Sequence, residues 1–251
     1  MSTLLTDTGV VFGRYLRQTL RSHISLIFGL IQPMLFLAFF GPLLEDVPLG
    51  GEGDSWQTLV PGLLIQLGLF SSAFAGFGII MEKQLGIVER MRVTPVSRLA
   101  LLLGRVLRDA LQLLVQSLLL VLLGVAFGLR APVLGVLIGF AFVSLLGISL
   151  ASLSYAFAMR VNTPQEFAPV INSLNLPAML LSGILLPMAL APTWLDVLSH
   201  FVPFRYLVEG TRAAFVGHYT DGSLGLGALA AVTLAVVSVS LGTRLFRRAG
   251  A

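Results

Sequence analysis

The charged residues between positions 82 and 98 are the groups in this chain whose types and spacing best suit the docking of a partner. Only 11% of the 251 residues are charged, yet the stretch EKQLGIVERMRVTPVSR gathers both signs of charge in a short space. Both flanks of the stretch are strongly apolar. The charged residues are Glu82, Lys83, Glu89, Arg90, Arg92 and Arg98.

The spacing within this stretch predicts a short amphipathic helix that ends in a rigid turn. Glu89 lies three residues before Arg92, a distance at which opposite charges meet on one helix face. Thr94 can then cap a second helix whose first position is taken by Pro95. An exposed element of this kind fits docking to another protein, and an ordinary solvated loop is the alternative.

Polar side chains inside apolar stretches form a second set of candidates. In a membrane such groups need partners or water, so they tend to face the bundle interior or a conduit. Hydrogen bonding between helices is the alternative explanation. The sparse charge favours an amphipathic or lipophilic cargo over a strongly ionic one. The candidate substrate-path residues are Gln32, Gln66, Gln112, Gln116, Asn172 and Asn175.

One carboxylate, Asp109, also lies in an apolar stretch, with Arg105 and Arg108 nearby. A transporter driven by an ion gradient usually binds the ion at such a group. The adjacent arginines favour a local ion pair instead. A secondary carrier or channel, and a membrane scaffold without transport, remain the alternatives from other functional classes.

The sequence motifs do not predict enzymatic activity for this chain. A nucleotide-binding P-loop requires G-x-x-x-x-G-K-[ST], and the single lysine, Lys83, follows Glu82. The absence of cysteine excludes thiolate sites, and His23, His200 and His218 lack the spacing of a metal site. We therefore expect no catalytic residue, no metal and no cofactor bound by this chain itself.

The composition indicates an integral membrane protein. Hydrophobic residues make up 56% of the chain, which leaves too little polar surface for a water-soluble globule of this size. The net charge of +4 is too small and too scattered for binding to nucleic acid.

Six windows are long and apolar enough for the roughly 20 residues that a helix needs to cross a bilayer. They are residues 24–44, 57–80, 106–128, 133–158, 168–188 and 223–243. Residues 189–219 are apolar but broken by prolines and charges, which predicts short extracytoplasmic re-entrant helices. Residues 1–23 predict an amphipathic helix in the cytoplasmic headgroup plane, or else a plain basic flank.

The distribution of basic residues predicts the orientation. With six crossings and both termini cytoplasmic, all of the 16 basic residues except Arg130, Arg205 and Arg212 lie inside, as the positive-inside rule requires. The 82–98 stretch then forms the longest cytoplasmic loop.

Three stretches resemble the membrane subunits of the type-2 ABC exporter family, in particular its daunorubicin-resistance type of permease. They are LRQTLRSHISLIFGLIQPMLFLAFFG (16–41), MEKQLGIVERMRVTPVSRLALLLGRVLRD (81–109) and NLPAMLLSGILLPMALAPTWLDVLSHFVPFRYLVEGTRAAF (175–215). The most specific motif is carried by Glu82, Gly86, Glu89, Arg90, Thr94, Pro95, Ser97 and Arg98.

This resemblance implies a single all-α transmembrane domain over residues 1–251, with an amphipathic connecting helix, six transmembrane helices, a cytoplasmic coupling helix between the second and third, and re-entrant helices before the sixth. It implies a bacterial inner-membrane location and separate ATPase subunits that bind ATP and magnesium. It implies a 2+2 assembly in which a second copy of this chain is the other permease, with pairing to a different permease as the alternative. The coupling residues are then Glu82, Gly86, Glu89, Arg90, Arg92, Thr94, Pro95 and Arg98.

The same resemblance makes residues 160–167 a secondary contact for the ATPase, through Arg160 and Glu166. It implies export of a drug, an antibiotic or a lipid-like molecule. Polysaccharide and lipo-oligosaccharide exporters in the same family provide the alternative cargo.

Overall fold

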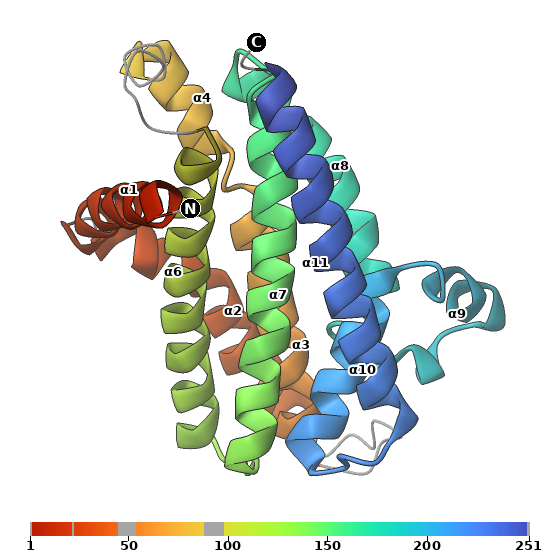
Figure 1. The fold of residues 1–251 in the computed structure, drawn as a ribbon. Coiled ribbons are helices and arrows are strands. Elements are labelled where there is room, and N and C mark those ends of the chain that lie inside the picture. The colour runs from red at the N-terminus through yellow and green to blue at the C-terminus, as the bar shows by residue number, and fades with distance from the viewer. Residues whose placement is uncertain (1, 22, 45–53, 88–97, 250–251) are drawn as a thin grey trace.

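The computed structural model describes residues 2–21, 23–44, 54–87 and 98–249, and every regular element in these ranges is a helix (Figure 1). The predicted all-α class is confirmed for them. The elements are α1 (Ser2–Arg21), α2 (His23–Leu44), α3 (Ser55–Ala73), α4 (Phe77–Gln84), α6 (Arg98–Ala126), α7 (Val133–Ala158), α8 (Pro164–Leu181), the 3-10 turn η1 (Met188–Leu190), α9 (Thr193–Ser199), α10 (Pro203–Val216) and α11 (Gly222–Ala249).

Within the described residues, 4 helical segments are long and apolar enough to cross a membrane. They are Ser55–Gln84, Leu99–Ala126, Val133–Ala158 and Gly222–Leu245. These segments make the chain a multi-pass membrane protein.

The two other predicted crossings correspond to α2 and α8. Helix α2 contains the apolar stretch Gly29–Leu44 among the residues whose side chains the structure describes. Helix α8 begins at Pro164 and ends at Leu181, before the expected end at residue 188. The chain turns there because Gly183 adopts a left-handed φ of +67°, which glycine allows without steric cost. That α2 and α8 also cross the membrane stays a prediction.

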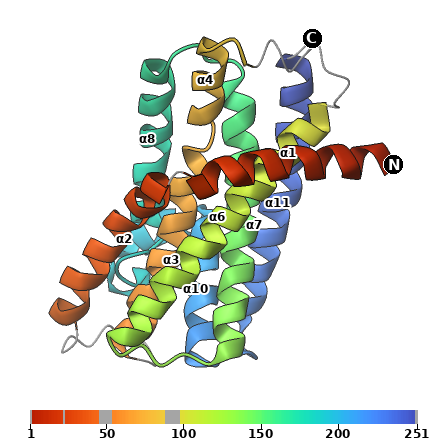
Figure 2. The same ribbon diagram turned by 90° about the vertical axis from the view of Figure 1, so that its left-hand side faces the viewer.

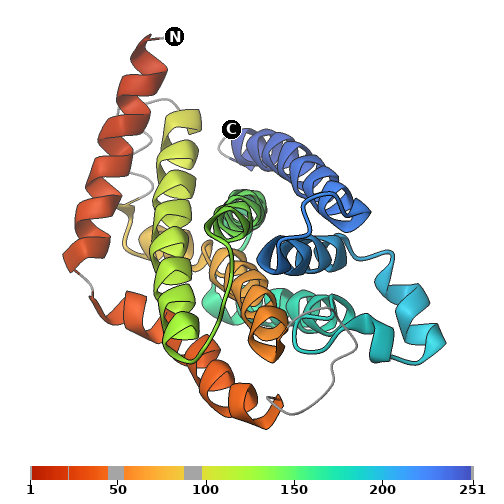
Figure 3. The ribbon, with the colours of Figure 1, turned by 90° about the horizontal axis from the view of Figure 1, so that it is seen from below.

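Helix α3 lies at the centre of the bundle, between α7, α2, α10 and α6 (Figure 3). Its side chains are buried on nearly all sides, and Leu63, Leu64 and Ile65 are fully enclosed. A helix that is apolar around its whole circumference packs in this way in a membrane-protein interior. Polar residues on α3 are therefore held within the protein.

A break between α3 and α4 interrupts the second predicted span at residues 74–76. Ser154 of α7 bridges it, since its hydroxyl donates to the Ala73 carbonyl at 2.6 Å and accepts the Gly76 N–H at 2.8 Å. A Cβ at position 76 would lie 2.5 Å from the Ser154 carbonyl oxygen, so only glycine permits this approach. Ser154 thus satisfies backbone groups that the break leaves unpaired.

Helix α1 lies across the bundle rather than along it and packs on α6 (Figure 2). Val11 and Tyr15 face the bundle and are buried, whereas Arg14 and Arg17 are exposed. A Cβ at Gly104 of α6 would collide with Val11, so the two helices touch closely there. The packing agrees with an amphipathic helix, whose place at the membrane surface stays a prediction.

The bundle has two distinct ends. Helix α4, the beginning of α6 and the end of α11 lie at the top of Figure 1, and α10 and the α6–α7 turn lie at the bottom. We refer to them as the α4 end and the α10 end. The predicted topology makes the α4 end cytoplasmic.

Candidate functional site

Glu82, near the end of α4, joins this helix to two others. Its Oε2 accepts a hydrogen bond from Arg105 Nη2 of α6 at 2.5 Å and another from the Tyr15 hydroxyl of α1 at 3.2 Å. The Arg105 guanidinium also lies 4.9 Å from the centre of the Tyr15 ring. Burial raises the pKa of Tyr15 to about 12, so the phenol is a neutral donor at physiological pH. Glu82 therefore connects α4 directly to α1 and α6.

Lys83 joins the same helix to the connection between α7 and α8. Its Nζ donates to the Val161 carbonyl at 2.8 Å, the Met159 carbonyl at 3.2 Å and Asn162 Oδ1 at 3.2 Å. The two loops that the sequence assigns to the cytoplasmic face are thus in direct contact. Sequence reasoning missed Lys83 as a connecting residue, although it is the only lysine in the chain.

The structure describes only part of the predicted coupling motif. Gly86 ends α4 with a φ of +67°, and its N–H donates to the Lys83 carbonyl at 3.0 Å. Arg98 is the first residue of α6. The predicted residues Glu89, Arg90, Arg92, Thr94 and Pro95 lie outside the described residues, as does most of the predicted coupling helix.

The second predicted contact loop is ordered by its own cap. The Thr163 hydroxyl accepts the Glu166 N–H at 3.3 Å at the start of α8. Arg160 and Glu166 are both exposed at the α4 end. Their predicted contact with an ATPase stays a prediction.

Asp109 lies in a buried cluster just inside the bundle. Arg108 Nη1 lies 3.1 Å from Asp109 Oδ1, and the Tyr155 hydroxyl of α7 donates to Asp109 Oδ2. Arg108 also donates to Gln112 Oε1 at 3.2 Å. The expected local ion pair is confirmed with Arg108, whereas Arg105 hydrogen-bonds Glu82 instead.

Two of the predicted path residues share a pocket between α2 and α3. Gln32 and Gln66 line this space of about 190 Å³ together with Ser71. Gln66 is only 1% exposed, and neither atom of its amide has a hydrogen-bond partner in the described part of the chain. A buried amide without a partner is costly, so this group is available to a molecule that enters the pocket.

A second pocket of about 220 Å³ lies nearer the α4 end and is lined also by Gly78 of α4. The two share Ser71, and the second is also lined by Arg108, Asp109 and Gln112. The first pocket is lined by Gln32 and Gln66, and the second by Gln112. We call the two pockets the polar file.

The other predicted path residues lie outside the polar file. Gln116 is buried against Gly29 of α2, where a Cβ would collide with its amide nitrogen. Asn175 of α8 is buried and its Nδ2 has no partner among the described residues. Asn172 is exposed on α8. Neither asparagine lines the two pockets of the polar file.

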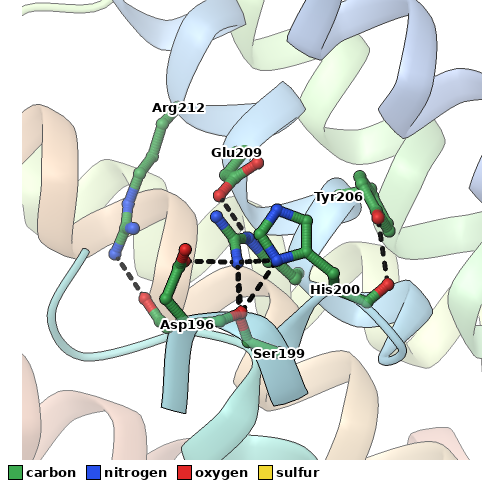
Figure 4. Close-up of polar contacts among 8 residues, drawn as sticks. Asp196, Ser199, His200, Tyr206, Glu209 and Arg212 are labelled. Carbon is green, nitrogen blue, oxygen red and sulfur yellow. Dashed lines mark hydrogen bonds and ion pairs between the residues drawn. The ribbon is translucent and has the colours of Figure 1, made fainter. Parts of the chain in front are cut away.

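A second polar cluster fastens α9 to α10 at the other end of the bundle (Figure 4). Arg205 of α10 donates to Asp196 Oδ1 at 2.6 Å and to Glu209 Oε1 at 2.7 Å. It also donates to the Ser199 hydroxyl, and the Tyr206 hydroxyl donates to the His200 carbonyl at 2.9 Å. One arginine thus holds two carboxylates, and α9 cannot leave α10 without breaking these pairs.

Arg212 fixes α10 to the bundle core. Its guanidinium donates to the carbonyls of Thr58, Gly183 and Ile184 at 3.0, 2.8 and 3.1 Å. A pocket of about 560 Å³ lies beside it, lined also by Asp196, Arg205 and Glu209. In the sequence these charges indicate only a broken span. The spacing of four residues between Arg205 and Glu209 is the sequence signal that predicts their ion pair on one helix face.

Comparison with known proteins supplies the family. A family model described as "ABC-2 type transporter" matches residues 6–216, which is most of the chain. The match includes Glu82 with its partners Tyr15 and Arg105, and α10. The chain belongs to the ABC-2 type transporter family. This confirms the resemblance seen in the sequence, and it identifies a transporter permease family rather than a family of enzymes.

Individual ABC-2 relatives are named as permeases. The ycf38 transport permease of Cyanophora paradoxa is 30% identical over 208 residues, covering 81% of this chain and 72% of the relative. The Mycobacterium tuberculosis protein named as the doxorubicin resistance ABC transporter permease DrrC is 24% identical over 210 residues, covering 81% and 75%. The Escherichia coli protein named as the multidrug ABC transporter permease YbhR is 23% identical over 171 residues, covering 66% and 45%. Membership of the ABC-2 family implies an ABC transporter with an ATPase partner.

Proposed function

We propose that this chain is the permease half of an ATP-driven exporter that moves an amphipathic or lipophilic small molecule out across the bacterial inner membrane. Two copies assemble with two ATPase subunits, which bind the ATP and magnesium. Each copy has six crossings with both termini cytoplasmic, so that α2 and α8 join the four long apolar spans. Export of polysaccharide or lipo-oligosaccharide by the same mechanism is the alternative cargo.

The arrangement around Glu82 and Lys83 carries the proposal. A push on residues 82–98 would move α4, and α4 is fastened to α1, α6 and the α7–α8 connection by charged hydrogen bonds. Charged hydrogen bonds between partly buried groups are stronger than neutral ones, so they hold helices in register as α4 moves. ATP-driven closure of the ATPase subunits would therefore reach several helices at once.

The polar file supports a passage within each copy. Gln66 offers unpaired amide atoms in an otherwise apolar helix, and Arg108 and Asp109 neutralise each other at the other end of the file. Such a lining favours a compact polar group on an apolar molecule over a bare ion. Doxorubicin, which appears in the name of a relative, is a suitable first test cargo.

The assembly of two copies draws support from the exposed face of α8. Asn172 and Ser173 are exposed on this face beside Leu174 and Leu176. Polar groups that face lipid are unfavourable, and a second copy of the chain would cover them.

Charge reversal in the proposed coupling loop tests the function. Glu89→Lys and Arg92→Glu should leave the permease folded and its ATPase subunit bound, while ATP hydrolysis no longer drives doxorubicin transport in reconstituted vesicles. Arg130→Glu, at an exposed position in the α6–α7 turn of the α10 end, is the matched control and should transport like the parent. Normal transport by both loop variants would show that this loop does not couple the two subunits.

A further inference from the structure

Helix α4 is packed more closely on its α7 and α8 side than on its α6 side. It contacts α7 and α8 (Figure 2), and the chain just before it touches α7 at Gly76, where a Cβ would lie 2.9 Å from the Ala158 Cβ. At Gly78, by contrast, a Cβ would meet no atom within 4 Å. The chain is therefore tightly packed on one side of α4 and has open space on another.

Two pockets lie between α4 and α6. One, of about 410 Å³, is lined by residues of α1, α4 and α6, and the other, of about 220 Å³, belongs to the polar file. Gly78 of α4 and Arg108 of α6 line both pockets. This space leaves room for α4 to tilt toward α6 without displacing it.

The break at residues 74–76 has the hydrogen bonds of a pivot. The Ala75 N–H donates to the Ser72 carbonyl at 3.2 Å and the Phe77 N–H to the Phe74 carbonyl at 3.0 Å. This is the three-residue spacing of a 3-10 helix, which often marks a hinge when it interrupts an α-helix. The buried Ser154 hydroxyl binds the backbone on both sides of the break, so the pivot is fixed to α7.

The apolar contacts of α4 lie close to this pivot. Its buried side chains are Ile79 and Ile80, which are in the first turn of the helix. The helix has 8 residues and is therefore about 12 Å long, so a tilt of about 20° moves its far end by about 4 Å. The first turn moves much less, and apolar contacts are non-directional, so they tolerate this displacement.

The far end of α4 is held from two sides. Lys83 Nζ donates to the Val161 carbonyl of the α7–α8 connection at 2.8 Å. Glu82, the preceding residue, binds Arg105 of α6 and Tyr15 of α1. If the contacts of Lys83 break, the remaining ionic contact of this end is the one toward α6.

We propose that residues 74–76 are a hinge at which α4 swings between its contacts with α7 and α8 and a second position closer to α6. The contacts of Lys83 hold the first position. The swing narrows the two pockets that Gly78 and Arg108 line, one of which belongs to the polar file. This inference deepens the proposed function, because it supplies the movement by which a push on residues 82–98 reaches the polar file.

Distances between spin labels on the purified full-length permease test the hinge. The chain has no cysteine, so Gln84→Cys on α4 and Leu174→Cys on α8 place two labels specifically, and both positions are exposed. Lys83→Met removes the contacts that hold α4 near α8. It should lengthen the mean distance between the labels by about 2–4 Å, the displacement that a tilt of α4 produces.

Gly78→Leu tests the direction of the movement. A leucine side chain at this position fills space between α4 and α6, so its addition to the Lys83→Met variant should restore the parental distance. Gly78→Ala is the matched control and should leave the longer distance, because one methyl group occupies little of the two pockets.

A second label pair, Leu174→Cys with Leu107→Cys on α6, reports on the bundle without α4 and should give equal distances in the parent and in Lys83→Met. Thermal unfolding midpoints show whether each variant folds, and Lys83→Leu replaces Lys83→Met if it does not. An unchanged distance to α4, or an equal change in the second pair, would overturn the hinge. Failure of Gly78→Leu to restore the distance would overturn the position closer to α6. The assay contains no ATPase subunit, so these results are distinct from failure of the proposed coupling.

Discussion

Gln66 shows how one residue can link folding to transport. It is buried in the central helix α3, lines the polar file, and has no hydrogen-bond partner among the described residues for either amide atom. A buried unpaired polar group costs about 1–3 kcal/mol. A glutamine at this position is therefore unfavourable for folding alone, and we interpret it as a contact for cargo.

Replacing Gln66 by methionine separates these two effects. Methionine has a similar shape and no amide, so Gln66→Met should keep or raise the free energy of unfolding by up to about 3 kcal/mol. Loss of one hydrogen bond to the cargo should reduce transport by roughly two- to tenfold. Chemical unfolding in detergent and vesicle transport assays measure the two quantities.

Gln57, on the same helix, is the control because its side-chain amide has hydrogen-bond partners. Its side chain accepts the Asp54 N–H at 3.0 Å in a capping box and donates to the Arg130 carbonyl, so Gln57→Met should lower stability. A loss of stability in Gln66→Met equal to that in Gln57→Met would show that Gln66 has a structural partner instead.

At the scale of elements, α4 is the lever of the proposed coupling. It is short, begins after a break that Ser154 bridges, and ends at Gln84, just before the left-handed turn at Gly86. Its position is fixed by Glu82 and Lys83 at its end and by Ile79 and Ile80, which are buried in the core. Such a helix can move as a unit when force is applied at residues 82–98.

The left-handed turn at Gly86 sets where α4 ends. Gly86→Ala should cost about 1–2 kcal/mol of unfolding free energy, because a Cβ is unfavourable at a φ of +67°. It should also reduce the amount of transport per ATP hydrolysed, since the turn that follows α4 would adopt a different backbone conformation. Both are measurable on reconstituted complexes.

Gly78 of the same helix is the control for this change. A Cβ there meets no atom within 4 Å, so Gly78→Ala should stabilise the helix by about 0.5–1 kcal/mol. If Gly86→Ala is as stable and as well coupled as Gly78→Ala, the turn at Gly86 has no part in coupling.

The sequence predicts the long helices well and their interruptions poorly. Apolar runs of sufficient length indicate α6, α7 and α11, because burial in lipid or protein requires them. The break at 74–76 lies within a continuous apolar run and depends on Ser154, which is distant in sequence. The early end of α8 depends on Gly183, and sequence reasoning continued the helix through it.

In the candidate sites, the charged residues are likewise predicted from the sequence, whereas their partners are not. Glu82 and Asp109 stand out in the sequence because charge is rare there, and the structure gives both of them partners. The partners Tyr15 and Tyr155 could not be chosen in advance, since a tyrosine in an apolar helix has no distinguishing pattern. Contacts between helices far apart in the chain decide which tyrosines take part.

In the whole molecule, the α4 end is where the proposed function places the ATPase, and the α10 end is fastened by Arg205 and Arg212. One pocket of the polar file is lined by Gly78 of α4, and the other is lined by Gln66 of the central helix. The ABC-2 family is one of permeases, which work with an ATPase partner. Energy conversion is therefore assigned to that partner.

Isolation of the permease from its native membranes, with the proteins bound to it, tests this central claim most directly. We expect an ABC ATPase subunit to be recovered in equal amount with the permease, and Glu82→Lys to reduce this recovery or abolish ATP-dependent transport by the complex. Recovery of the permease without an ATPase, or nucleotide-independent transport by the permease alone in sealed vesicles, would contradict it.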